Sequence, residues 1–267
     1  MYLADYHMHS ICSMDGNNPL VDLAQCAVAA GLKEICLTDH CDMLDIKGGE
    51  NFTYDWAPVY GQLAEARAAY AGRLKIKMGL EYGSGFVSPA HAEKILSAEG
   101  LDFVIGSVHN MSVARGGRDF YYESYEDRGY VHELLSDYME SLQLLAESPY
   151  YDVVGHIIYL LRYVPKREGF PKDMSPWWEQ VRSVMQAAIA QGKGIEVNTH
   201  CGNAIEPWRA ILLEYKRLGG EILTFGSDAH HPENVGKGIE AGQVLAKACG
   251  FSRFCVYEKR APVFQAL

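Results

Sequence analysis

The sequence predicts an α/β protein that forms a seven-fold (β/α) barrel in a single domain over residues 1–267. Three observations support this fold class. Short apolar runs rich in β-branched residues alternate with longer segments of helical spacing, as in repeated βα units. The length of 267 residues suits one such barrel. No linker, internal repeat or low-complexity stretch divides the chain.

Seven strands and seven helices are predicted in alternation. The strands are expected at residues 2–9, 34–40, 75–83, 102–109, 152–156, 194–199 and 221–228. The helices are expected at residues 20–30, 57–70, 89–98, 128–146, 176–191, 207–218 and 236–248. Several of these helices begin at or near proline, and Gly31, Gly192 and Gly219 stand where helices commonly end.

Composition narrows the class of protein. Hydrophobic residues make up 48% and charged residues 22% of the chain, which is typical of a globular protein. The net charge of −10, without any run of lysine and arginine, argues against binding of long nucleic acid. The seven cysteines never form C-x-x-C, so neither a disulfide framework nor a zinc ribbon is indicated. Without a signal-like or membrane-spanning segment, we expect a cytoplasmic protein that does not bind membranes.

Two connections are longer than a βα turn requires, at residues 41–56 and 110–127. Both follow predicted strands, which places them on the face of the barrel where active sites form. Long loops in compact domains are often functional, so we expect these two to cover a site.

Histidines and carboxylates gather at the ends of the predicted strands. His7 and His9 share one side of the first strand because side chains alternate along a strand. Later strands end in Thr38-Asp39-His40, Glu81, Ser107-Val108-His109, Gly155-His156 and Ser227-Asp228-Ala229-His230. The carboxyl ends of parallel barrel strands converge on one mouth, so these side chains are expected to lie together.

This set of side chains predicts two or three divalent metal ions. Imidazole and carboxylate ligands together suit zinc, iron or manganese. Glu81 could bridge two ions, and two ions about 3.5–4 Å apart suit displacement at phosphorus. The sequence therefore favours hydrolysis of a phosphoester, in which a metal-bridging hydroxide attacks the phosphorus atom.

Taken together, these motifs resemble the polymerase and histidinol phosphatase (PHP) family over nearly the whole chain. The resemblance implies a distorted (β/α)7 barrel with a trinuclear metal centre. It assigns the first metal to His7, His9, Glu81 and Asp228, the second to Glu81, His109 and His156, and the third to Asp15, His40 and His230. Asp39 would orient neighbouring ligands without binding a metal.

Within the family, residues 107–121 and 195–199 look most like the histidinol-phosphatase branch, which implies a small phosphorylated metabolite, L-histidinol phosphate, as substrate in histidine biosynthesis. One departure is that residues 198–203 read Asn-Thr-His-Cys-Gly-Asn and lack the arginine of that branch. Arg162 resembles its other phosphate-binding arginine. Arg115 or Arg118 could replace the missing one, and His200 could approach the substrate. Asp228 and His230 are both candidates for the general acid.

Two other functions remain open from the sequence. A phosphodiesterase or nucleotidase could use the same metal site on another small phosphoester. A regulatory or storage domain could bind metal without catalysis. No oligomeric state follows from the sequence.

Overall fold

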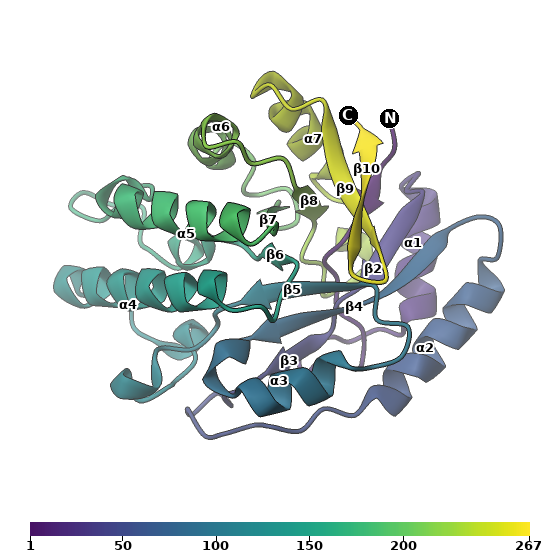
Figure 1. Cartoon of the computed structure of the whole chain (residues 1–267), viewed down its shortest axis with the longest axis horizontal. Coiled ribbons are helices and arrows are strands. Elements are labelled where there is room, and N and C mark those ends of the chain that lie inside the picture. The colour runs from purple at the N-terminus through teal and green to yellow at the C-terminus, as the bar shows by residue number, and fades with distance from the viewer.

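Seven parallel strands form the centre of the computed structural model, which describes residues 1–267 (Figure 1). They are β1 (Ala4–Asp5), β2 (Glu34–Leu37), β4 (Lys75–Gly83), β5 (Phe103–Ser107), β6 (Val153–Val154), β7 (Gly194–Asn198) and β8 (Leu223–Gly226). Their order in the sheet is β1-β2-β4-β5-β6-β7-β8, so chain order is also spatial order. The predicted strands are all present, although β1 and β6 each keep only two residues.

The sheet closes nearly into a barrel where its first and last strands meet. Beyond β1, the backbone N of Tyr6 donates to Phe225 O at 2.9 Å. The backbone N of Asp228 donates in turn to His7 O at 2.9 Å, and Met8 forms a parallel bridge with Ala229. These bonds confirm the predicted barrel, and the very short strands at the seam and at β6 make it a distorted one.

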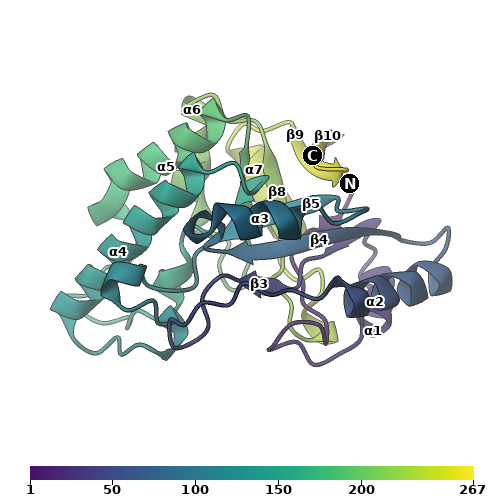
Figure 2. The same cartoon turned by 60° about the horizontal axis from the view of Figure 1, so that its bottom comes forward.

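Seven α-helices surround the sheet, as predicted (Figures 1 and 2). They are α1 (Leu20–Ala29), α2 (Trp56–Ala69), α3 (Pro89–Leu96), α4 (Arg128–Glu147), α5 (Trp178–Ala190), α6 (Trp208–Arg217) and α7 (Ile239–Ala248). Gly31, Gly192 and Gly219 have φ angles of 78°, 67° and 89°, which is the left-handed conformation that ends many helices. None of the helices combines the length and hydrophobicity needed to cross a lipid bilayer.

The second predicted strand, residues 34–40, is divided in the structure. After β2 ends at Leu37, the chain continues as β3 (His40–Asp42), which pairs with the far half of β4 and places His40 opposite Glu81. Because β2 and β3 both pair with β4, the sequence reads as one continuous strand, and its hydrophobic pattern does not predict the break after Leu37. It brings His40 beside the centre of the site.

A C-terminal hairpin, which the sequence analysis does not predict, covers one end of the barrel. It consists of β9 (Arg253–Glu258) and β10 (Ala261–Ala266) and lies near both termini (Figure 1). The Tyr257 ring packs 4.7 Å from Phe103. The backbone N of Lys259 donates to the Asp102 carboxylate, which precedes β5. The hairpin therefore closes the amino-terminal end of the barrel, opposite the strand ends that carry the histidines.

Candidate metal centre

A pocket of about 610 Å³ opens at the carboxyl ends of the strands. The two long loops contribute Leu44 and Ile46 from one side and Tyr121 and Tyr122 from the other. The loops also contact each other, because Lys47 and Arg118 form an antiparallel bridge. Both loops thus line the mouth of the site, where the sequence analysis places them.

Glu81, at the end of β4, lies at the centre of a ring of imidazoles. Its Oε2 atom is 3.0 Å from Nε2 of His7 and 3.1 Å from Nδ1 of His40. Its Oε1 atom is 2.7 Å from Nε2 of His156 and 3.1 Å from Nε2 of His109. Each carboxylate oxygen therefore faces a different pair of histidines, which is the arrangement required of a ligand that bridges two cations.

Asp228 completes the side of the ring formed by His7 and His9. Its Oδ1 atom lies 3.5 Å from the Nε2 atom of each histidine. Asp228 adopts a left-handed φ of 61°, which aspartate tolerates better than most residues and which is common in functional sites. The barrel seam maintains this conformation through the bond from the Asp228 backbone N to His7 O.

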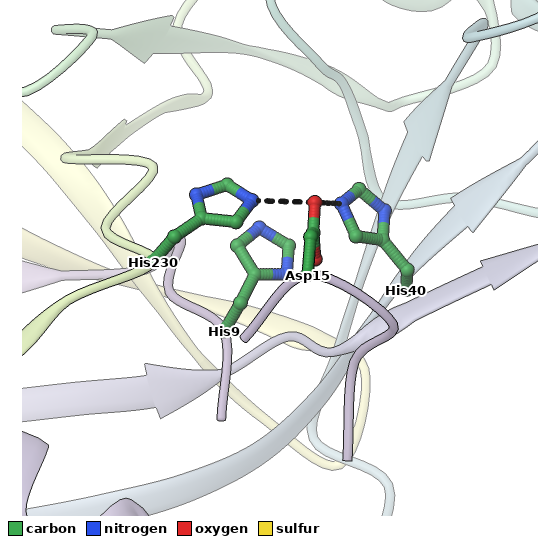
Figure 3. A group of neighbouring side chains, drawn as sticks. All are labelled: His9, Asp15, His40 and His230. Carbon is green, nitrogen blue, oxygen red and sulfur yellow. Dashed lines mark ion pairs between the residues drawn. The ribbon is translucent and has the colours of Figure 1, made fainter. Parts of the chain in front are cut away.

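Asp15 reaches the cluster from a loop (Figure 3). Its Oδ2 atom is 3.0 Å from Nε2 of His230 and 3.5 Å from Nε2 of His40. The His9 ring stacks between those of His40 and His230, at 4.3 and 4.2 Å. All nine residues predicted as metal ligands therefore gather in one cluster, and His9 stands nearer to the Asp15 group than the predicted assignment implies.

The donor atoms of this cluster fit divalent cations. Nε2 of His7, Nε2 of His9, Nδ1 of His40 and Oε2 of Glu81 are buried and make no hydrogen bond of suitable geometry, although the three nitrogens lie 3.0–3.4 Å from the oxygen. Buried polar atoms are normally satisfied, so such a convergent group of unsatisfied nitrogens and oxygens indicates a place for a cation. Mixed imidazole and carboxylate donors suit zinc, iron or manganese.

Residues that the sequence analysis does not include hold these histidines in orientation. Nδ1 of His109 lies 2.8 Å from Oδ1 of Asp42, and Nδ1 of His7 lies 2.6 Å from Oε1 of Glu196. Such contacts fix the ring and leave its other nitrogen free to bind a metal. Asp42 is two residues after His40 on β3, and Glu196 shares a side of β7 with Asn198. Period-two spacing is the signal that could have found them.

Asp39 supports the cluster without entering the ring, in agreement with its expected role. Its Oδ1 atom accepts from Ser13 Oγ at 3.0 Å. Ser13 Oγ lies 3.1 Å from Nδ1 of His9 and accepts from the His40 backbone N at 2.9 Å. One buried carboxylate thereby links two candidate ligands through a serine.

The electrostatics of the cluster call for positive charge at its centre. Burial opposes protonation of His7, but Glu196, Glu81 and Asp228 outweigh burial and raise its pKa well above the usual value. Burial likewise opposes protonation of His40, yet Glu81, Asp15 and Asp42 raise its pKa to about 9. Burial alone would raise the pKa of Glu81, but His7, His40 and His109 hold it well below the usual range. Protons on these imidazoles take the place that metal ions would otherwise occupy.

Arg162 and His200, two predicted substrate contacts, line the pocket. Arg162 lies at the end of a 3₁₀ helix, Tyr159–Arg162, and donates from Nη1 to Asp228 Oδ2 at 2.8 Å and from Nη2 to Asn198 Oδ1 at 2.7 Å. His200 follows β7 with a left-handed φ of 46°. A guanidinium and an imidazole thus stand beside the candidate metal ligands.

Arg115 and Arg118 do not line the pocket. Arg115 pairs with Glu133 on the outer surface of α4, and Arg118 pairs with Glu123. The loop bends back on itself at Gly116, which has a φ of 96°, and both side chains remain about half exposed. Of the three arginines that the sequence analysis names, Arg162 is therefore the one that lines the pocket.

The fold and the cluster define a class of protein: a distorted (β/α)7 barrel with a histidine and carboxylate metal centre at its carboxyl mouth. The PHP domain family matches residues 5–200, and the chain belongs to this family. The recognition made from the motifs is therefore confirmed.

Named relatives match over most of the chain. Histidinol-phosphatase from Lactococcus lactis subsp. lactis is 27% identical over 262 residues, covering 95% of this chain and 93% of the relative. The crystal structure of histidinol phosphate phosphatase from that organism, complexed with zinc, L-histidinol and phosphate, matches with a TM-score of 0.84 and 25% identity over 98% of both chains. A structure from Listeria monocytogenes, with a TM-score of 0.74 and 17% identity over 89% of this chain and 99% of that one, shares the fold.

Proposed function

We propose that this chain is a metal-dependent phosphatase that hydrolyses L-histidinol phosphate to L-histidinol and phosphate. The observation that carries the proposal is the buried ring of unsatisfied imidazole and carboxylate atoms around Glu81, with Arg162 in the same pocket. The Lactococcus lactis relatives bear the name of this activity and align over nearly the full length of both chains. The proposed place of the reaction is histidine biosynthesis.

Three groups of residues would hold the metal ions. The proposed first group is His7, His9, Glu81 and Asp228, the second is Glu81, His109 and His156, and the third is Asp15, His40 and His230. When bound, divalent ions would acidify a water molecule and offset charge on the phosphoryl oxygens. Zinc, iron and manganese all suit these donors, and two or three ions are proposed.

Residues of the chain would perform the remaining tasks. Arg162 would donate to phosphoryl oxygens, since a guanidinium matches their geometry and its position is already fixed by Asp228 and Asn198. His200 would contact the phosphate from the end of the neighbouring strand, since β7 pairs with β6, the strand that precedes Arg162. A proton for the leaving alkoxide oxygen would come from His230, which is 28% exposed to the pocket, or from Asp228.

The alternative substrates predict different behaviour. A phosphodiesterase would cleave a nucleotide diester with the same metals, and a non-catalytic domain would bind metal without turnover. The retention of all nine candidate ligands in one cluster favours catalysis over mere binding. The pocket of about 610 Å³, lined in part by the two long loops, favours a monoester of a small molecule.

An assay of phosphate release by manganese- and zinc-loaded protein tests the proposal. Its substrates are L-histidinol phosphate, an aryl phosphate and a nucleotide diester. We expect kcat/KM for L-histidinol phosphate of about 10⁴ M⁻¹s⁻¹ or above. We also expect a loss of about 100-fold or more in His109→Ala, and no loss in the control His132→Ala, whose side chain is exposed on α4. Full turnover by folded His109→Ala would contradict the metal mechanism. Preference for the nucleotide diester would contradict L-histidinol phosphate as the substrate.

A further inference from the structure

One carboxylate in the pocket lacks the cationic partner that the others have. Five carboxylates line the pocket: Asp15, Asp42, Glu81, Asp119 and Asp228. Four of them have a histidine or arginine nitrogen within 4.0 Å. Asp119 has none, although it is partly buried and lies outside the candidate metal ligands.

Backbone contacts hold Asp119 close to His109, one of the candidate metal ligands. Asp119 bridges to Asn110, the residue after His109, and its backbone N donates to Ile46 O at 3.3 Å. One carboxylate oxygen, Oδ1, accepts from the backbone N of Tyr121 at 2.7 Å. No other hydrogen bond to the side chain is present, so Oδ2 is left for a ligand. Burial raises the pKa of this carboxyl, which a bound cation would offset.

Tyrosine rings connect Asp119 to Arg162. The guanidinium of Arg162 lies 5.2 Å from the centre of the Tyr159 ring. The Tyr163 ring is 5.3 Å from Tyr159 and 5.8 Å from Tyr121, the residue whose amide bonds Asp119. The pocket thus presents a cationic group beside the metal ligands and an anionic group farther along one aromatic wall.

From this polarity we infer that Asp119 is a specificity-determining residue that binds the cationic nitrogen of the substrate alcohol, with Tyr121 and Tyr163 as the wall against which that group packs. The inference rests on the proposed function, because it takes Arg162 and the metal cluster as the phosphate end. The substrate class is a phosphomonoester of a small alcohol that carries an ammonium or imidazolium group. Aromatic faces attract such cations as well.

Asp119→Asn tests the inference with little disturbance, because the amide oxygen of asparagine can still accept from the Tyr121 backbone N. Glu126→Gln is the matched control, since Glu126 lies on the same loop but its side chain is 75% exposed and pairs with Arg167 outside the pocket. Both variants are compared with the wild type on L-histidinol phosphate and on 4-nitrophenyl phosphate, whose leaving group carries no cation.

We expect Asp119→Asn to lower kcat/KM for L-histidinol phosphate about 10- to 100-fold, as for loss of a hydrogen bond to a charged group, and to leave 4-nitrophenyl phosphate unchanged. The inhibition constant of L-histidinol against 4-nitrophenyl phosphate should rise by a similar factor, while that of inorganic phosphate stays the same. Glu126→Gln should change none of these values.

An equal loss on both substrates, or no loss on either, would overturn the role of Asp119. Failure of the proposed function has a different signature, which is a wild-type enzyme that shows no preference for L-histidinol phosphate. In that case the L-histidinol inhibition constants of the wild type and Asp119→Asn still decide the inference. Equal constants would contradict it, and a raised constant in the variant would support it.

Discussion

Glu196→Gln should weaken metal binding without unfolding the barrel. In the structure Oε1 of Glu196 lies 2.6 Å from Nδ1 of His7, and Oε2 accepts from the His156 backbone N at 2.9 Å. The carboxylate therefore accepts on both sides. A glutamine side chain keeps one acceptor and replaces the other with a donor, so one of the two contacts must change.

Either orientation of the amide carries a cost. If the amide nitrogen faces His7, Nδ1 must accept, and the proton moves to Nε2, the atom that faces Glu81 and Asp228. The metal then loses a lone pair, and loss of such orienting contacts typically costs 10- to 100-fold in metal affinity, about 1.4–2.7 kcal/mol. If the amide nitrogen faces His156, two donors meet, at a cost of about 1–3 kcal/mol. The two orientations of the amide therefore cost similar free energies.

Metal content by mass spectrometry after dialysis against graded chelator measures the effect, alongside kcat/KM and thermal unfolding of the metal-free protein. Glu147→Gln is the control, because Glu147 is exposed at the end of α4 and its side chain accepts a hydrogen bond only from Gln143. If Glu196→Gln binds metal as tightly as this control and keeps full activity, the orienting role of Glu196 is refuted.

Three further predictions concern metal affinity and stability. Metal affinity should fall as the pH is lowered below about 9, because His40 is then protonated and the metal must displace its proton; metal titrations at several pH values measure this. Gly226→Ala should lose metal and about 1–3 kcal/mol of stability, measured by urea unfolding, since a Cβ would lie 2.3 Å from both Glu196 Oε1 and His7 Cβ. Phe254→Ala should destabilise the protein by about 3–5 kcal/mol, because this ring of β9 is buried and its centroid lies 5.5 Å from that of Phe225 on β8.

Each of these predictions has an outcome that opposes it. Metal affinity that is independent of pH would mean that the ligand imidazoles are already neutral in the free protein. Wild-type metal content in Gly226→Ala would mean that the backbone near Gly226 can shift to accommodate a Cβ without displacing His7 or Glu196. Phe264→Ala is the control for the hairpin, since this ring is 39% exposed, and equal unfolding free energies for the two variants would contradict the stabilising contribution of the buried Phe254 ring.

The sequence predicts the barrel and the cluster well because both follow from local rules. Buried parallel strands produce β-branched runs, and a strand delivers alternate side chains to one face, so His7 and His9 are placed together by spacing alone. The convergence of Glu81, His109 and His156 needs only the further rule that parallel strands end at one mouth.

What the sequence does not predict depends on contacts between distant segments. The hairpin at residues 253–266 is stabilised by contacts with a distant part of the chain. Its strand β10 is mostly exposed, and Tyr257 packs against Phe103 on β5. Arg115 and Arg118 are equally plausible phosphate contacts from sequence, and only the bend at Gly116 shows that both face outward. Long loops have no periodicity that would reveal the direction of a side chain.

Asp15 shows how a loop residue joins the site without any periodic signal. At Gly16 a Cβ would lie 1.9 Å from Ser10 O, so only glycine allows the chain to fold back so closely behind His9. Ser13, within this fold, bonds both His9 and the His40 backbone. A substitution at Gly16 should therefore act on the Asp15 group of ligands and leave the pairing of Glu81 with His156 in place. The position of Asp15 in the third ligand group therefore depends on the close approach of the Gly16 backbone to Ser10. The spacing of residues along the sequence does not reveal such an approach.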